Sequence, residues 1–171
     1  MLSEKQKQGK KNRAAGARFE TKVRNNLVSR GWIVDRWNNT VEFGSTTGSD
    51  GTLTVESTLA AAKAKYNPFT KQMMMRTGGF PDFVAFKRGP QGTYVVVGIE
   101  CKTNGYLDPT EREMCKCLVD NEIFSALLVA QRGEKRGTID YLEFIDGEKQ
   151  KESKKMSDVW EPKVSREPGN R

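Results

Sequence analysis

Residues 93–102 read TYVVVGIECK, and this stretch decides the fold. From Tyr94 to Ile99 it is apolar and rich in β-branched residues, which is typical of a strand that is covered on both faces. Two charged residues, Glu100 and Lys102, close the stretch. Because side chains alternate across a sheet, these two lie on the same face. We therefore expect residues 93–102 to form the middle strand of a sheet.

The flanking residues predict the neighbours of this strand. Residues 82–87 read as the preceding strand, joined to it by a turn that contains glycine and proline. Asp108 followed by Pro109 predicts the N-cap and first position of a helix that ends near residue 121, and residues 123–130 read as the next strand. The order strand, helix, strand implies a parallel pair with a right-handed crossover.

The outer parts of the chain predict a second helix and further strands. Phe19, Val23 and Leu27 recur every four positions, which indicates an amphipathic helix. From the patterns in the rest of the chain we expect a helix over residues 14–30, a strand over 32–37, a loop over 38–52, a short helix over 54–65 and an edge strand over 139–145.

We expect one α/β domain with polar ends. It spans residues 14–146, with a basic flexible arm at 1–13, an insertion at 38–79 and a polar tail at 147–171. No apolar stretch approaches the ~20 residues needed to cross a bilayer. We therefore expect no membrane partner. The three cysteines form no CxxC pair, which favours a reduced, cytoplasmic compartment.

The amino-acid composition limits the catalytic mechanisms open to the protein. The chain has 171 residues and no histidine. This excludes Ser-His-Asp and Cys-His nucleophile systems, histidine-based metal sites and acid–base catalysis by imidazole. Any catalysis must therefore use carboxylates, lysine or a hard metal ion.

The positive charge is concentrated at one end of the chain. The chain has 29 Lys and Arg against 22 Asp and Glu, a net charge of +7. Residues 1–30 hold nine basic and two acidic residues, so the remainder is neutral. This pattern favours contact with the phosphates of a nucleic acid, although a solubilising tail would have the same composition.

Acidic residues converge at the end of the middle strand. Unpaired charges are costly to bury, so Glu100 and Lys102 need a partner or a metal there. Asp82 opens the neighbouring strand and is placed to lie beside Glu100. A divalent cation relieves the repulsion between two carboxylates, and oxygen ligands favour Mg²⁺ or Mn²⁺.

These residues resemble a known family. Pro81-Asp82, followed after 18 residues by Glu100-Cys101-Lys102, resembles the signature of the PD-(D/E)xK nuclease superfamily. Phe19-Glu20 is similar to the helix-borne glutamate of that superfamily. Residues 79–83 and 100–129 look like its VRR-NUC and archaeal Holliday-junction-resolvase branches. Leu107 to Glu111 sits where VRR-NUC domains carry Leu-Ser-Pro-x-Gln, so Glu111 replaces the usual glutamine.

The resemblance covers roughly residues 14–130 and implies a restriction-endonuclease-like mixed β-sheet flanked by α-helices. It implies an Mg²⁺- or Mn²⁺-dependent endonuclease that hydrolyses double-stranded or branched DNA, such as junctions and flaps. Asp82, Glu100, Glu20 and the backbone carbonyl of Cys101 would bind the metal, and Lys102 would orient water or neutralise charge. Junction resolvases act as symmetric dimers, so a homodimer is one version of this reading. The residues expected to contact nucleic acid are Lys10, Lys11, Arg13, Arg18, Arg76, Thr103 and Asn104.

Simpler roles for these residues stay open. Asp82 could cap backbone amides, Glu100 and Lys102 could form a surface pair, and Glu20 could pair with Arg24 one helical turn away. The chain could then be a nucleic-acid-binding module without catalysis. A nuclease of the same fold directed at RNA or single strands is a further alternative.

Overall fold

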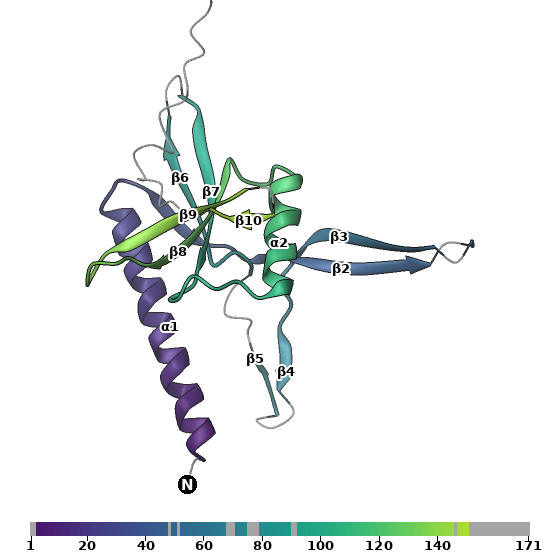
Figure 1. The fold of residues 1–171 in the computed structure, drawn as a ribbon, viewed down its shortest axis with the longest axis horizontal. Helices are drawn as coiled ribbons and strands as arrows, with labels where there is room; N and C mark the ends of the chain where they lie inside the picture. Colours follow the sequence, from purple (N-terminus) through teal and green to yellow (C-terminus); the bar gives the residue numbers. More distant parts are fainter. Residues whose placement is uncertain are drawn as a thin grey trace, which may run out of the picture.

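The computed structural model describes residues 3–47, 49–50, 52–67, 71–74, 79–89, 92–145 and 147–150. The protein is a mixed α/β structure (Figure 1). Its elements are α1 (Glu4–Val28), β1 (Ile33–Arg36), β2 (Asn39–Thr47), β3 (Leu53–Ala61), β4 (Lys65–Asn67), β5 (Gln72–Met74), β6 (Phe83–Arg88), β7 (Tyr94–Cys101), α2 (Pro109–Asp120), β8 (Ala126–Arg132), β9 (Ile139–Ile145) and β10 (Glu148–Lys149).

Six strands form one mixed sheet in the order β1-β6-β7-β8-β9-β10. All neighbours are antiparallel except β7 and β8, which are parallel and are connected through α2. The predicted central strand and the predicted crossover through a helix are therefore confirmed. The strand predicted over residues 139–145 is also present, but the short β10 pairs with its outer side, so it is not the edge.

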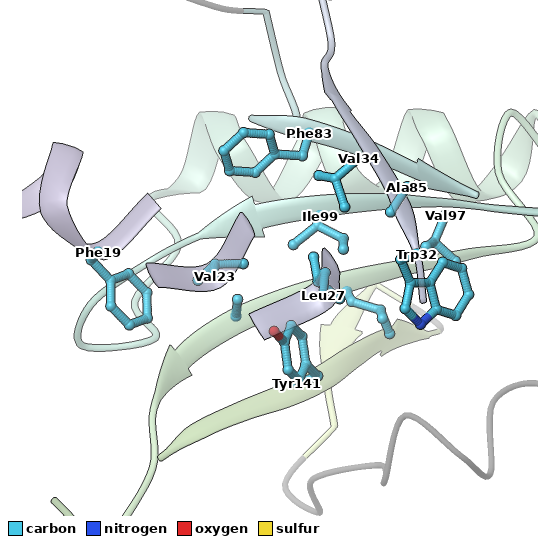
Figure 2. Packing of buried hydrophobic residues seen from close by; sticks show 12 residues of the cluster. Phe19, Val23, Leu27, Trp32, Val34, Phe83, Ala85, Val97, Ile99 and Tyr141 are labelled. Carbon is cyan, nitrogen blue, oxygen red and sulfur yellow. The ribbon is translucent and has the colours of Figure 1, made fainter. Parts of the chain in front are cut away.

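The two helices cover opposite faces of the sheet. On one face, Phe19, Val23 and Leu27 of α1 pack against Ile99 of β7 and the neighbouring strands (Figure 2). On the other face, Leu118 of α2 belongs to a second cluster, with residues of β8 and β9. The alternation along β7 therefore directs Ile99 and Cys101 towards α1, and Glu100 and Lys102 towards α2.

Close packing on the α2 side requires a glycine in the middle of β7. A Cβ atom at Gly98 would lie 2.8 Å from atoms of both Phe124 and Leu127. These two side chains belong to the cluster beneath α2. The glycine inside an otherwise β-branched strand thus lets α2 and the segment after it approach the sheet.

Helix α1 begins earlier than predicted. It starts at Glu4, so the expected start near residue 14 is wrong. Ser3 and Gln6 form a capping box, in which each side chain accepts a hydrogen bond from the other residue's backbone N–H. The apolar stripe marks only the part of the helix that packs on the sheet, whereas the cap determines where the helix begins.

The segment between β1 and β6 forms two β-hairpins. Strand β2 pairs with β3 over nine residues each, and β4 pairs with β5. In Figure 1 both hairpins extend away from the sheet, and the β2–β3 hairpin reaches furthest. The loop expected over 38–52 and the helix expected over 54–65 are therefore wrong. Threonine and valine favour strands, and nine consecutive cross-strand pairs outweigh the helix preference of the alanines at the end of β3.

The described helices also bear on membrane insertion. Neither α1 nor α2 contains an apolar stretch long enough to cross a bilayer. Most of the segment predicted as a polar tail, from residue 151 onward, lies outside the described residues.

Candidate functional site: a carboxylate pair and a lysine

The antiparallel register of β6 and β7 brings Asp82 and Glu100 together. Phe83 pairs with Ile99 in this register. Asp82, which precedes Phe83, therefore lies next to Glu100, which follows Ile99. The backbone N–H of Asp82 donates to Glu100 Oε2 at 3.2 Å. The backbone N–H of Cys101 donates to Asp82 Oδ2 at 2.9 Å. The predicted proximity of the two carboxylates is thus present, and Asp82 also caps a backbone amide.

Both carboxyl groups are in an unfavourable environment for negative charge. Only 5% of the surface of Glu100 is exposed. Burial, and then the negative charge of Asp82, raise the pKa of Glu100 well above its ordinary value. Burial also raises the pKa of Asp82, against the hydrogen bond from Cys101, which lowers it. Nearby positive charge therefore does not offset the cost of ionising both carboxyl groups, and a divalent cation would relieve that cost.

Lys102 lies between two carboxylates on the α2 side. Its Nζ is 3.3 Å from Glu100 Oε1 and donates a short hydrogen bond to Glu111 Oε1. Burial alone lowers the pKa of Lys102, but the bonds and charges of Glu111 and Glu100 outweigh it, so the pKa is raised. Lys102 is therefore an ammonium at neutral pH, suited to donating hydrogen bonds and unsuited to accepting a proton.

Glu111 is fixed by the start of α2. It is the third residue of the helix and forms a capping box with Asp108, with bonds of 2.9 and 3.0 Å. Its second carboxylate oxygen is then directed at Lys102. Sequence reasoning placed Glu111 in the motif but missed this contact. The Asp-x-x-Glu spacing was the available signal, because a capping box holds the side chain near the N-terminus of the helix.

Glu20 belongs to the opposite side of the sheet. It lies on α1 and forms an ion pair with Arg36 of β1, at 3.0 Å. Arg36 in turn stacks over Phe83, with 5.5 Å from Cζ to the ring centroid. The charge of Glu20 still raises the pKa of Asp82, so the two lie at the same end of the sheet. Sequence reasoning missed Arg36 as the partner of Glu20 and considered Arg24 instead.

Cys101 contributes its backbone to the site. Its side chain packs against the α1-side cluster, and burial strongly raises the pKa of its thiol. A thiol in that environment is a poor nucleophile. The backbone N–H of Cys101 donates to Asp82, whereas a metal contact by its backbone carbonyl stays a prediction.

The donor set fits a magnesium ion that keeps most of its water. Within the described parts of the chain, no three acidic or cysteine side chains form a group that could bind a metal by themselves. Asp82 and Glu100 are two adjacent carboxylates, and Mg²⁺ is commonly held by one or two carboxylates together with substrate phosphate. The predicted ligands Asp82 and Glu100 therefore fit, whereas the ion pair with Arg36 occupies Glu20.

The other predicted contact residues are dispersed. Asn104 accepts a hydrogen bond from the backbone N–H of Tyr106, and the carbonyl of Thr103 accepts one from Arg132, so both stabilise the strand end. Arg18 lines a groove described below. Lys10, Lys11 and Arg13 are exposed on the part of α1 that extends past the sheet (Figure 1). Arg76 lies outside the described residues.

No family model, curated protein or solved structure matches the chain. The similarity to PD-(D/E)xK nucleases therefore rests on the motif residues quoted above.

Proposed function

We propose that the protein is an Mg²⁺- or Mn²⁺-dependent endonuclease that hydrolyses phosphodiester bonds in DNA, with a restriction-endonuclease-like fold. The observation that carries the proposal is the buried pair Asp82 and Glu100 with the ammonium of Lys102 beside it. Two carboxylates and a lysine at the end of a central strand are the residues that the PD-(D/E)xK motif requires. The terminal concentration of positive charge adds a reason for a polyanionic substrate.

Each residue has a distinct role in this proposal. Asp82 and Glu100 would hold the ion through their carboxylate oxygens, and the bound ion would supply an acidified water and offset the negative charge of the phosphate. Lys102 donates hydrogen bonds to the phosphate oxygens as negative charge builds up, and Glu111 keeps its ammonium in place. The oxygen of water would form a bond to phosphorus as the bond from phosphorus to the leaving oxygen breaks. The water would lose one proton to solvent, and the leaving oxygen would take up one proton from solvent.

The proposed substrate is duplex or branched DNA, read through its backbone. The β2–β3 hairpin lies within the predicted insertion at 38–79, and residues 39–61 contain three acidic residues, Glu42, Asp50 and Glu56, and no basic one. Its charge therefore opposes direct contact with phosphates. Any contribution to recognising junctions would have to come from its shape. A homodimer that cuts two strands remains part of the proposal for branched substrates.

The test is cleavage of a labelled panel of linear duplex, flap, four-way junction, single-stranded DNA and RNA with Mg²⁺ or Mn²⁺. Glu100→Gln and Asp82→Asn are each expected to reduce the cleavage rate by at least ~100-fold while DNA affinity in EDTA is kept, because a lost metal ligand impairs chemistry. Glu113→Gln and Asp120→Asn make the same changes at exposed positions of α2 and serve as matched controls.

Two results would contradict the proposal. Cleavage that survives in both variants would place the chemistry elsewhere or in a contaminant. Binding without metal-dependent cleavage on any substrate would favour the alternative, a nucleic-acid-binding module in which Asp82 only caps the Cys101 amide. Cleavage confined to RNA or single strands would retain the chemistry and change the substrate.

A further inference from the structure

A basic groove lies between α1 and the turn that joins β8 to β9. Its volume is about 520 Å³. From the helix, Ala15 and the buried Phe19 contribute to its wall. The remaining side chains that line it are mostly cationic, and all of these are exposed: Arg18, Lys22, Arg132, Lys135 and Arg136. Five positive charges thus gather from two segments that are far apart in the sequence.

These charges are not neutralised within the described structure. None of the five cations forms an ion pair with another described residue. No acidic residue lines the groove. Glu134 of the turn and Asp140 of β9 line a neighbouring hollow, which Arg132 and Lys135 also border. Like charges held close together repel one another, so the groove attracts a ligand with several negative charges.

The cationic face continues along α1. Lys11, Arg18 and Lys22 follow at intervals of seven and four residues, which places them on one face of a helix. In Figure 1 the N-terminal turns of α1 extend beyond the sheet, so this face is longer than the groove itself. A linear polyanion could therefore follow the groove and then the helix.

The groove lies at the same end of the sheet as the carboxylate pair. Glu100 pairs with Val129, and Arg132 is three residues further along β8. The strand ends remain side by side, since the N–H of Arg132 donates to Thr103 O at 3.3 Å. Arg132 is thus one strand spacing across the sheet and three residues along the strand from Glu100, which places their Cα atoms about 11 Å apart. The rise per nucleotide of about 3.4 Å makes this roughly three nucleotides.

We propose that this groove binds the sugar–phosphate backbone of duplex DNA, roughly three nucleotides from the phosphate that would be cleaved beside Asp82 and Glu100. The inference rests on the proposed function and adds a second contact region to it. A duplex fits better than a single strand, because proteins that bind single strands offer exposed aromatic rings for stacking. The one aromatic residue lining this groove, Phe19, is buried beneath α1. Because Glu100 faces α2 and the groove faces α1, the backbone would pass over the ends of β7 and β8.

The test is the salt dependence of DNA binding in EDTA, followed by the fluorescence anisotropy of a labelled duplex. The groove variant carries Arg132→Ala, Lys135→Ala and Arg136→Ala. Each lost phosphate contact lowers the slope of log affinity against log salt by about 0.9, so we expect the slope to fall by about 2 to 3. The matched control removes three exposed cations away from the groove: Arg30→Ala, Arg88→Ala and Lys116→Ala. It is expected to keep the wild-type slope.

A second variant approaches the same groove from the helix. Arg18→Gln with Lys22→Gln changes no residue of the β8–β9 turn and is expected to lower the slope by about 2. It keeps the inference testable if the turn variant folds poorly. An unchanged slope in both groove variants, or an equal fall in the control, would overturn the inference.

The outcome is separable from the test of catalysis. Binding is measured without metal, so the groove can be confirmed in a protein that cleaves nothing, and then only the proposed nuclease activity fails. Metal-dependent cleavage by the wild type together with unchanged slopes would retain the nuclease and remove the groove. Glu113→Gln, at an exposed position of α2 outside the site, is expected to bind DNA with the wild-type slope, because it leaves all five cations in place.

Discussion

Replacing Glu100 with glutamine is expected to stabilise the metal-free protein at high pH. Glutamine has nearly the same shape as glutamate, and its carbonyl can accept the hydrogen bond from the Asp82 N–H. It carries no charge, so it avoids the cost of ionising a buried group beside Asp82. Lys102 would lose one carboxylate partner and keep Glu111. The result depends on pH because only the wild-type side chain titrates.

The size of the effect follows from the pKa of Glu100. Burial, followed by the charge of Asp82, raises this pKa from 4.5 to about 8. The folded state therefore binds the proton more tightly than the unfolded state does. The contribution to stability is present at low pH and is lost as the pH rises from the unfolded pKa towards the folded one. At about 1.4 kcal/mol per pKa unit, the loss between about pH 5 and pH 9 is on the order of 4 kcal/mol.

The assay is urea unfolding in EDTA at a series of pH values, for the wild type, Glu100→Gln and the exposed control Glu113→Gln. The free energy of unfolding of Glu100→Gln should exceed that of the wild type by a margin that grows with pH. The control should run parallel to the wild type. Adding Mg²⁺ near pH 8 should stabilise the wild type, because a ligand that binds only the folded state raises its stability, and should leave Glu100→Gln unchanged.

Parallel profiles for the wild type and Glu100→Gln would refute this reasoning. They would mean that Glu100 titrates near its ordinary pKa and that the site is wetter or better neutralised than its burial indicates. Equal stabilisation of both proteins by Mg²⁺ would instead place the ion elsewhere. The two results are independent, so the electrostatic argument and the metal assignment can fail separately.

Four further substitutions test other parts of the structure. Glu111→Gln should keep the cleavage rate within ~10-fold of the wild type, because glutamine also serves in a capping box, whereas Lys102→Ala should lower the rate by ~100-fold or more. Single-turnover rates compare the two variants. Equal losses of rate would contradict a merely positioning role for Glu111. Gly98→Ala should lower the free energy of unfolding by about 1 to 3 kcal/mol in urea titrations, because its Cβ would lie 2.8 Å from atoms of Phe124 and Leu127. An unchanged unfolding midpoint would show that α2 shifts freely. Glu20→Gln should reduce cleavage less than Glu100→Gln does, because Glu20 is paired with Arg36; an equal loss in rate would indicate that it binds the metal.

Sequence patterns predicted the elements that contain the site. The apolar run of β7, the proline after Asp108 and the apolar residues of β8 each have a local physical cause, so the central strands and α2 were found. The hairpins were missed because β2 and β3 depend on pairing with each other. Their serine, threonine and glycine content resembles that of a loop until the partner strand is known.

The site itself was predictable only in part. Asp82 and Glu100 were found because strand alternation and register follow from sequence. The ion pair of Glu20 with Arg36 joins residues 16 positions apart on separate elements, and the basic groove joins α1 to a turn more than a hundred residues later. Contacts of this kind depend on how the helix crosses the sheet, which no local pattern specifies.

The β2–β3 hairpin has a consequence for how this protein could vary. Its two ends meet, since Asn39 pairs with Ala61, and at its base Thr40 and Val41 are buried. Beyond that base, most of its contacts are between its own two strands. The outer part could therefore be lengthened, shortened or exchanged for another hairpin at little cost to the sheet. The protein thus combines a fixed core with an attachment that selection, or an engineer, can change independently of it.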